Sequence, residues 1–232
     1  MTFSPSPKLI TFDADDTLWN FSAMMRRGDE AVAGAILNRL GEEFAYMTPT
    51  FLRRMHKERL SQENSQTVNY IATRRDGYYR IFQKAGRRDA RRLANDFIEI
   101  YMAVRDADYV FWDDTLAVLN KLKGRVRLGY LTNGTTHPDR VGLTRFFDVV
   151  ILPDTLGMRK PRPEIWLHAA EQVGCWTSDI LHIGDDLEAD VAGALDAGAR
   201  GIWFNPNRQT NATTIQPTDE IDTLSAVCEW LA

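Results

Sequence analysis

The sequence predicts an α/β fold in which a parallel sheet has helices on both faces and a helical domain is inserted near the start of the chain. Two observations lead to this prediction. After about residue 114, short apolar runs bounded by turn residues alternate with amphipathic stretches, as in parallel sheets. Between about residues 20 and 110, apolar residues recur three and four positions apart, which is typical of helices.

The first strand is expected at residues 8–12, where Lys-Leu-Ile-Thr-Phe leads directly into Asp13. A lone strand cannot pair its own backbone groups, so this one must join the sheet formed by the strands after residue 114. The segment between them is therefore an insertion. We expect one α/β domain made of residues 1–18 and 112–232, and a helical domain at residues 19–111.

Four helices are expected in the insertion. Their apolar residues fall within 24–40, 51–60, 70–82 and 93–101. The second helix begins with Thr48 as its N-cap and Pro49 at its first position, and the third ends near Gly86.

Four further strands and five helices are expected after the insertion. The strands are at 126–132, 148–152, 180–184 and 201–204. The helices are near 114–123, 138–146, 163–174, 187–197 and 221–231. Ligands of such sheets bind beyond the carboxyl ends of the strands, so the residues that follow each strand are the candidates for a site.

Polar residues follow the strands in a distinct pattern. They are Asp13-Ala14-Asp15-Asp16-Thr17, Thr132-Asn133-Gly134, Arg159-Lys160-Pro161, and Gly184-Asp185-Asp186-Leu187-Glu188-Ala189-Asp190. Carboxylates held together repel one another unless they are protonated or bridged by a cation, and oxygen ligands suit Mg2+. A divalent cation beside Lys160 would accept a phosphate dianion. The pattern therefore predicts phosphoryl transfer.

The order of these motifs resembles the haloacid dehalogenase-like (HAD-like) hydrolase superfamily over essentially the whole chain. The resemblance includes DxDxT at residues 13–17, the hydroxyl of Thr132, Lys160, and GDDxxxD at residues 184–190. It implies a Rossmann-like core, and the insertion is similar to the small helical cap of subfamily I. The segments LTNG and LHIGDDLEADVAGALDAGA are most similar to bacterial nucleotidases and flavin mononucleotide phosphatases.

The resemblance also implies a role for each residue in a phosphatase with Mg2+ as cofactor. Asp13 would attack phosphorus, forming an aspartyl-phosphate, and Asp15 would act as general acid and then as general base. Asp13, the backbone carbonyl of Asp15, and Asp185 would hold the metal. Phosphate would be bound by Thr132, Asn133 and Lys160, and the surrounding residues Asp190 and Thr17 would support the site.

Three nearby residues have a simpler interpretation. Asp186 is either a ligand or a helix N-cap, and the cap is favoured. His182 lies in an apolar strand and is expected to be a core residue whose hydrogen bonds are satisfied. His137 either contacts substrate or starts a helix before Pro138.

Other activities remain open at this point. Asp15 favours phosphate-ester hydrolysis over haloacid dehalogenation, which needs no acid for a halide leaving group. A phosphomutase would share Asp15. A phospho-receiver domain is disfavoured because it lacks the long insertion and the acidic motif after the lysine, and a catalytically idle binding module is disfavoured by the intact motifs.

Composition limits the partners. The 28 basic and 32 acidic residues give a net charge of -4, which argues against a nucleic-acid binder. No apolar run is long enough for a membrane span, the start of the chain resembles no signal peptide, and the two cysteines form no motif, so we expect a cytoplasmic protein. Residues 51–100 nevertheless hold twelve basic and six acidic residues, either as solvated helix faces or as an attraction for anionic substrate.

The expected substrate is a small phosphorylated metabolite, with a nucleotide or flavin mononucleotide ahead of a sugar phosphate. Six aromatic residues could include a surface that stacks on a ring, although their helical spacing favours packing; they are Trp19, Phe21, Tyr70, Tyr78, Tyr79 and Trp112. The sequence leaves the oligomeric state open.

Overall fold

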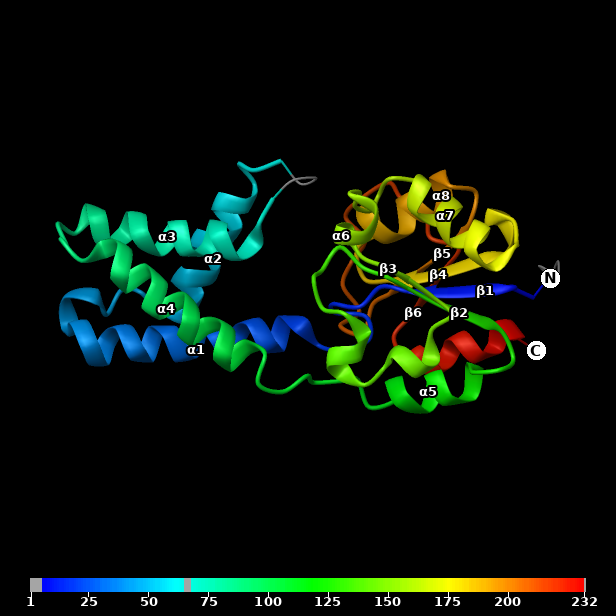
Figure 1. Ribbon diagram of the computed structural model, residues 1–232, viewed down its shortest axis with the longest axis horizontal. Helices are drawn as coiled ribbons and strands as arrows, with labels where there is room; N and C mark the ends of the chain where they lie inside the picture. Colours follow the sequence, from blue (N-terminus) through cyan, green and yellow to red (C-terminus); the bar gives the residue numbers. More distant parts are fainter. Residues whose placement is uncertain (1–5, 65–67, 232) are drawn as a thin grey trace. The chain divides into compact units, whose positions relative to one another are not determined.

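The computed structural model describes residues 6–64 and 68–231. The chain divides into two compact units, which Figure 1 shows coloured along the sequence. The core unit comprises residues 1–20 and 111–232, and the cap unit comprises residues 21–110. The first five residues, on which the expected absence of a signal peptide partly depends, lie outside the described part of the chain.

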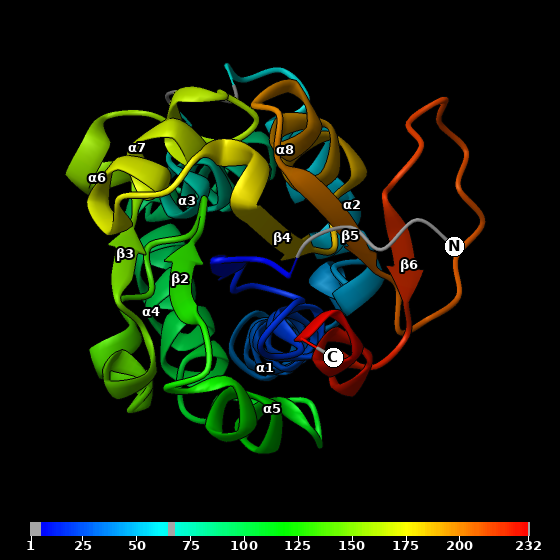
Figure 2. The ribbon, with the colours of Figure 1, turned by 90° about the vertical axis from the view of Figure 1, so that its right-hand side faces the viewer.

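The core unit is built on a six-stranded sheet of order β3-β2-β1-β4-β5-β6. The strands are β1 (Leu9–Phe12), β2 (Arg127–Leu131), β3 (Val149–Ile151), β4 (Ile180–Gly184), β5 (Arg200–Phe204) and β6 (Asp219–Ile221). All five pairs are parallel. The fold is therefore the α/β Rossmann-like fold that the sequence predicted, and Figure 2 shows the sheet almost edge on.

The register of β1 explains why distant motifs meet. Phe12 pairs with Tyr130 of β2 and with Ile183 of β4, so the three strands end at the same level. The backbone N–H of Asp13 donates to the carbonyl of Ile183 at 2.8 Å. Parallel strands that end together place the segments that follow them at one edge of the sheet.

Helices cover both faces of the sheet. They are α5 (Thr115–Leu122), α6 (Pro153–Leu156), α7 (Glu164–Val173) and α8 (Gly193–Asp196). Figure 1 shows α7 and α8 on one face, and α5 with the C-terminal helical turns on the other. None of the described helices is both long and apolar enough to cross a membrane.

Three of the predicted helices were wrong in part. The segment expected at 138–146 forms two 3-10 turns, Pro138–Val141 and Thr144–Phe146, because Gly142 adopts a left-handed φ of 71° between them. The segment expected at 187–197 is a π-helical turn, Leu187–Ala192, followed by the short α8.

The prediction of a helix at 221–231 missed the last strand. β6 ends at Ile221, and the helical part is a 3-10 segment, Leu224–Leu231. β6 contains Asp219, Glu220 and Ile221, of which only Ile221 is buried, so this edge strand carries no apolar alternation that a sequence pattern could reveal.

In the described residues of the cap unit, 21–64 and 68–110, four α-helices share one apolar core. They are α1 (Phe21–Leu40), α2 (Pro49–Leu60), α3 (Tyr70–Lys84) and α4 (Ala90–Arg105). Thr48 caps α2 as expected, its hydroxyl accepting from the N–H of Phe51 at 3.2 Å. Tyr78 is fully buried in the core of the cap unit, which supports packing for this aromatic residue, whereas Tyr70 is exposed.

Many basic residues of the cap unit have acidic partners within the same unit. The pairs include Arg53 and Arg74 with Asp29, Arg59 and Arg80 with Asp76, and Arg87 and Arg92 with Asp89. Each of these three carboxylates is shared by two guanidinium groups, so the pairs leave a net positive charge. Both interpretations of this basic stretch therefore stand.

Candidate active site

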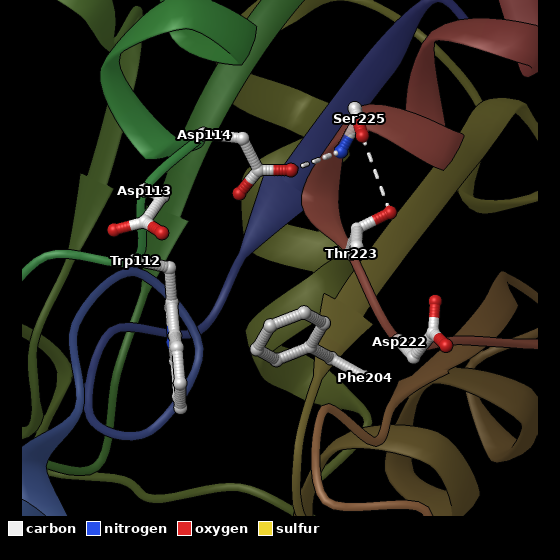
Figure 3. A pocket seen from close by; sticks show the side chains of 7 residues that line it. All are labelled: Trp112, Asp113, Asp114, Phe204, Asp222, Thr223 and Ser225. Atoms are coloured by element: carbon white, nitrogen blue, oxygen red, sulfur yellow. Dashed lines mark hydrogen bonds between the residues drawn. The ribbon is translucent and has the colours of Figure 1, made fainter.

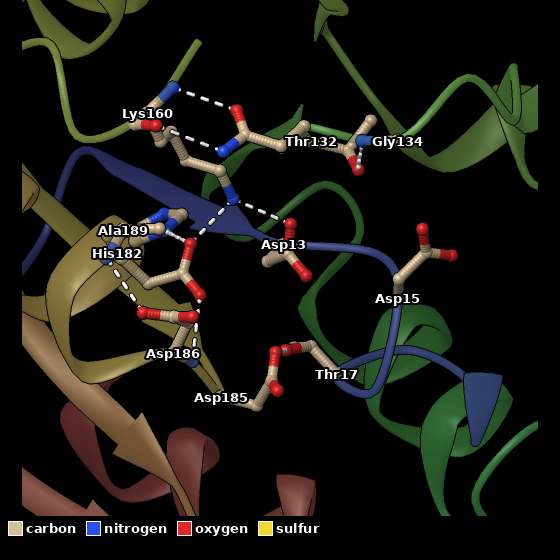
Figure 4. Close-up of polar contacts among 12 residues, drawn as sticks. Asp13, Asp15, Thr17, Thr132, Gly134, Lys160, His182, Asp185, Asp186 and Ala189 are labelled. Atoms are coloured by element: carbon tan, nitrogen blue, oxygen red, sulfur yellow. Dashed lines mark hydrogen bonds and ion pairs between the residues drawn. The ribbon is translucent and has the colours of Figure 1, made fainter. Parts of the chain in front are cut away.

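Asp13 and Lys160 form the centre of the candidate site. Asp13 follows β1, Lys160 lies in the segment between α6 and α7, and both are almost completely buried. The Lys160 ammonium Nζ lies 2.5 Å from Asp13 Oδ1 and 2.5 Å from Asp190 Oδ1. Figure 4 shows the Lys160 side chain pointing toward Asp13. The buried lysine thus bridges two carboxylates that follow different strands.

Burial and mutual attraction shift the pKa values of Asp13, Lys160 and Asp190. Burial raises the pKa of Asp13 to about 8, although the Lys160 ammonium opposes the rise. Burial disfavours charge on the other two groups as well. The carboxylates of Asp13 and Asp190 nevertheless hold the pKa of Lys160 above its usual value, and Lys160 and a hydrogen bond from His182 hold the pKa of Asp190 below its usual value. Lys160 and Asp190 are therefore charged. For Asp13, the attraction of Lys160 does not offset the cost of burying a negative charge.

Asn133 fixes the backbone of Lys160. Its amide Nδ2 donates to the Lys160 carbonyl at 3.0 Å, and its Oδ1 accepts from the Lys160 N–H at 2.8 Å. In addition, Arg159 Nη1 donates to the Asn133 carbonyl at 2.6 Å. The sequence indicated Asn133 only as a phosphate ligand. The structure adds a bridge from the loop after β2 to the segment that carries Lys160.

Thr132 begins the loop after β2 and is buried. Its hydroxyl Oγ1 accepts from the backbone N–H of Gly134 at 2.9 Å, which holds the loop in a tight turn. Such a turn keeps the hydroxyl on the edge of the sheet near which Asp13 also lies.

A cluster of three carboxylates could hold a cation. One oxygen each of Asp13, Asp185 and Asp190 lies within 4.8 Å of the others. Burial raises the pKa of Asp185 well above its ordinary value, and the neighbouring carboxylates of Asp13 and Asp190 add to the rise. Thr17 contacts Asp185, its hydroxyl donating to Oδ1 at 3.4 Å. A hard divalent cation such as Mg2+ fits this set of oxygen donors because it would relieve their repulsion.

Asp15 is set apart from this cluster. Figure 4 shows its carboxylate pointing away from Asp13 and Lys160. Asp15 Oδ1 accepts a hydrogen bond from the indole Nε1 of Trp19 at 2.9 Å. The two carboxyl groups of the DxDxT motif thus have different surroundings: Asp13 lies beside the Lys160 ammonium, and Asp15 lies beside the indole of Trp19.

The structure supports the simpler interpretation of three residues. Asp186 is an N-cap, since its Oδ1 accepts from the N–H groups of Glu188 at 2.9 Å and Ala189 at 2.8 Å. His182 is fully buried, with Nδ1 2.8 Å from Thr11 Oγ1 and Nε2 3.2 Å from Asp190 Oδ1. His137 starts the turn at Pro138, its Nδ1 accepting from the Asp139 N–H at 3.4 Å.

Three supporting contacts had no signal in the sequence pattern. They are the indole of Trp19 on Asp15, the hydroxyl of Thr11 on His182, and the indole of Trp203, whose Nε1 donates to the Asp185 carbonyl at 2.9 Å. Tryptophan and threonine are ordinary residues of buried strands and turns. Their polar partners become visible only in three dimensions.

A surface pocket of about 320 Å3 elsewhere in the core unit is lined by different residues. They are Trp112, Asp113, Asp114, Phe204, Asp222, Thr223 and Ser225, shown in Figure 3. Trp112 packs edge-on against the ring of Phe204, and Asp114 accepts from the Ser225 N–H at 2.7 Å. The pocket contains Trp112, one of the six aromatic residues considered for ring stacking, but none of the predicted catalytic, phosphate-binding or metal-binding residues.

Comparisons with known proteins agree with this geometry. The model of the haloacid dehalogenase-like hydrolase family matches residues 7–198. The chain is 25% identical over 239 residues to the 5-amino-6-(5-phospho-D-ribitylamino)uracil phosphatase YigB of Escherichia coli, covering 94% of this chain and 93% of that protein. It is 28% identical over 209 residues to the glyceraldehyde 3-phosphate phosphatase of Methanothermobacter thermautotrophicus, covering 85% of each.

A solved structure shows the same fold. The 2-haloacid dehalogenase of Pseudomonas syringae pv. Tomato superimposes with a TM-score of 0.73 at 29% identity, covering 97% of this chain and 98% of that one. Since the family model spans most of the chain, and the strand ends bring its motifs together, the protein belongs to the haloacid dehalogenase-like hydrolases.

Proposed function

We propose that the protein is a Mg2+-dependent phosphatase that hydrolyses a small phosphomonoester through an aspartyl-phosphate at Asp13. One observation supports this most strongly: the buried Asp13 carboxylate lies 2.5 Å from the Lys160 ammonium, beside two further carboxylates. A nucleophilic carboxylate, a fixed positive charge and oxygen ligands for a cation are what phosphoryl transfer requires.

The first half-reaction transfers the phosphoryl group to the protein. A carboxylate oxygen of Asp13 forms a bond to phosphorus while the bond from phosphorus to the ester oxygen breaks. The proton of the Asp15 carboxyl group moves to that leaving oxygen, so the products are an alcohol, the Asp13 acyl phosphate and the Asp15 carboxylate. Lys160 supplies positive charge to the phosphoryl oxygens during the transfer.

The second half-reaction restores the protein. Water attacks phosphorus of the acyl phosphate, its proton passes to the Asp15 carboxylate, and the bond from phosphorus to Asp13 breaks. Phosphate leaves, Asp13 is again a carboxylate and Asp15 again carries a proton. Both halves use the same groups, so a single arrangement serves both directions of proton transfer.

The remaining residues bind and orient. The Thr132 hydroxyl and one amide hydrogen of Asn133 are assigned to phosphate, since Asn133 Nδ2 carries two hydrogens and bonds Lys160 with one of them. Asp190 holds Lys160, and Thr17 holds Asp185. Asp13, Asp185 and the backbone carbonyl of Asp15 would hold Mg2+, which when bound neutralises charge on the phosphoryl oxygens.

Asp15 favours a phosphatase over a dehalogenase, although a dehalogenase has the similar fold reported above. A halide leaves without a proton, whereas an alkoxide needs one. The two curated relatives are also named as phosphatases of small phosphorylated compounds. A nucleotide or flavin mononucleotide is the favoured substrate, followed by a sugar phosphate. Cys175 and Cys228 are free thiols, which agrees with a cytoplasmic location.

A panel of phosphorylated metabolites, assayed by phosphate release with and without Mg2+, tests this function. The panel contains nucleoside monophosphates, flavin mononucleotide and sugar phosphates, with p-nitrophenyl phosphate as a general substrate and a 2-haloacid as the competing one. We expect Mg2+-dependent phosphate release and no halide release. Halide release without phosphatase turnover would assign the protein to dehalogenation, and transfer of phosphate to a second sugar hydroxyl would identify a mutase.

A further inference from the structure

Trp19 is a buried residue whose indole donates a hydrogen bond to Asp15, the proposed general acid and base. Its side chain is 0% exposed, and its indole Nε1 donates to Asp15 Oδ1 at 2.9 Å. The ring packs edge-on against Phe111, at 6.2 Å between centroids, and lies 6.4 Å from the ring of Tyr130. Aromatic contacts on both sides restrict the rotation of the indole, so the direction of its N–H group is set by packing.

The backbone around Trp19 is also anchored. The N–H of Leu18 donates to the Ala14 carbonyl at 2.8 Å, and the Thr115 hydroxyl donates to the Leu18 carbonyl at 2.9 Å. Asp15 and Trp19 are joined by a further isolated bridge of parallel type. These hydrogen bonds within the turn that carries the DxDxT motif hold the indole of Trp19 next to the carboxylate of Asp15.

Gly134 lies against Oδ2, the other carboxylate oxygen of Asp15, and limits the space available to it. A Cβ atom built on Gly134 would lie 2.5 Å from Asp15 Oδ2 and 3.1 Å from the Thr132 hydroxyl oxygen. These separations are shorter than ordinary contacts, so only a residue without a side chain leaves room for Asp15 here. Oδ1 is thus held by the indole of Trp19, and Oδ2 rests against the backbone of the loop after β2.

We propose that Trp19 is a positioning residue that holds Asp15 in the orientation required for proton transfer to and from the leaving oxygen. The inference rests on the proposed function and adds a residue to it. In this role Oδ1 accepts the indole N–H, and the Asp15 carboxyl group carries the proton that passes to the leaving oxygen. The indole N–H keeps its own proton throughout, and the bonds that form and break are those of the two half-reactions above.

The dependence of rate on the leaving group tests this role. Phenyl phosphate, p-nitrophenyl phosphate and 2,4-dinitrophenyl phosphate have similar shapes but leaving groups that need progressively less protonation. In Trp19→Phe one aromatic ring is kept, and the pyrrole half of the indole is lost together with its N–H. We expect kcat/KM for phenyl phosphate to fall by about ten- to a hundredfold, the range for a misplaced general acid, and that for 2,4-dinitrophenyl phosphate by less than about threefold.

Two variants accompany this measurement. Trp166→Phe is the matched control, because Trp166 is another fully buried tryptophan of the core unit and its indole nitrogen has no hydrogen-bond partner among the described residues. It should leave the ratio of the two rate constants unchanged. Gly134→Ala places a methyl group against Asp15 Oδ2 and so displaces the carboxyl group. It should shift the ratio of the two rate constants in the same direction as Trp19→Phe, which keeps the test available if Trp19→Phe does not fold.

The outcomes separate this inference from the proposed function. Turnover by the wild-type protein that is lost in Asp13→Asn supports the phosphatase, whatever Trp19 does. A leaving-group ratio that changes in Trp19→Phe but not in Trp166→Phe supports the positioning role; where Trp19→Phe does not fold, the same change in Gly134→Ala supports it. If a folded Trp19→Phe lowers all three rate constants by one common factor, or lowers none, Trp19 only packs, and the same result in Gly134→Ala decides the question where Trp19→Phe does not fold. A wild-type protein without phosphatase turnover would overturn both proposals.

Discussion

Replacing Asn133 by alanine should affect stability and catalysis together. The substitution removes the two hydrogen bonds that join the Asn133 amide to the backbone of Lys160, at 2.8 and 3.0 Å. Each such bond contributes roughly 0.5–1.5 kcal/mol, so the free energy of unfolding should fall by about 1–3 kcal/mol. For a protein of this size, that is a fall in Tm of about 2–4 °C per kcal/mol.

The catalytic effect follows from the freedom that Lys160 gains. Without the Asn133 amide, the Lys160 backbone loses both hydrogen bonds to the loop after β2, and the bond from Arg159 to the backbone carbonyl of residue 133 is left to join the two segments. A displacement of about 1 Å at a reacting group can cost up to about a hundredfold in rate. We therefore expect kcat for p-nitrophenyl phosphate to fall by about ten- to a hundredfold in Asn133→Ala.

Asn211→Ala is the matched control. Asn211 also uses its amide on local backbone, with Nδ2 donating to the Ile215 carbonyl at 2.8 Å and Oδ1 accepting from the Thr213 N–H at 2.8 Å, but it lies in the loop between β5 and β6. Thermal unfolding and steady-state kinetics are measured for both variants. Similar losses of Tm, with activity lost only in Asn133→Ala, are expected. Wild-type kcat in Asn133→Ala would refute the reasoning.

The other predictions concern the buried charges. Burial raises the pKa of Asp13 from 3.8 to about 8 and also raises that of Asp185, whereas burial lowers the pKa of His56 and of His182 from 6.5. Above about pH 6.5, where the histidines are neutral in both states, the native protein therefore binds more protons than the unfolded chain. Without divalent cations, Tm should fall as pH rises from about 6.5 to about 8, which thermal scans would check; a Tm that rises steadily across this window would contradict the prediction. Asp185→Asn should raise Tm in the absence of Mg2+ and abolish the stabilisation that Mg2+ gives the wild type, as measured by calorimetry, whereas an unchanged response to Mg2+ would exclude Asp185 as a ligand. His182→Leu removes the side-chain partner of the buried Thr11 hydroxyl and one of the hydrogen bonds of Asp190, so urea unfolding should show a loss of about 1–3 kcal/mol; no loss would mean that these bonds contribute little.

The parallel sheet could be predicted from the sequence because its inner strands are apolar on both faces. β1 has four fully or almost fully buried residues, and every residue of β4 is buried. Such runs, separated by amphipathic helices, have few alternative structures. β6 could not be predicted, since two of its three residues are exposed acids at the edge of the sheet. The short helical turns after β2 and β4 were predicted as regular helices, because the spacing of their apolar residues does not distinguish a short helical turn from an α-helix.

The candidate site could be predicted only as a list of residues. Asp13, Lys160, Asp185 and Asp190 follow strands or lie in loops that a parallel sheet brings together, so their proximity follows from the topology. The bonds among them do not. The amide of Asn133 on the Lys160 backbone and the indole of Trp19 on Asp15 depend on loop conformation, which composition and periodicity do not encode.

Trapping the phosphorylated protein tests the central proposal most directly. The enzyme is mixed with a 32P-labelled phosphomonoester and Mg2+ and quenched in acid within one turnover, and the labelled peptide is mapped. Borohydride reduction of a parallel sample converts an aspartyl-phosphate to homoserine. The account predicts a label that hydroxylamine removes, homoserine at position 13, and no label in Asp13→Asn. A label on another residue, or turnover that persists in Asp13→Asn, would contradict it.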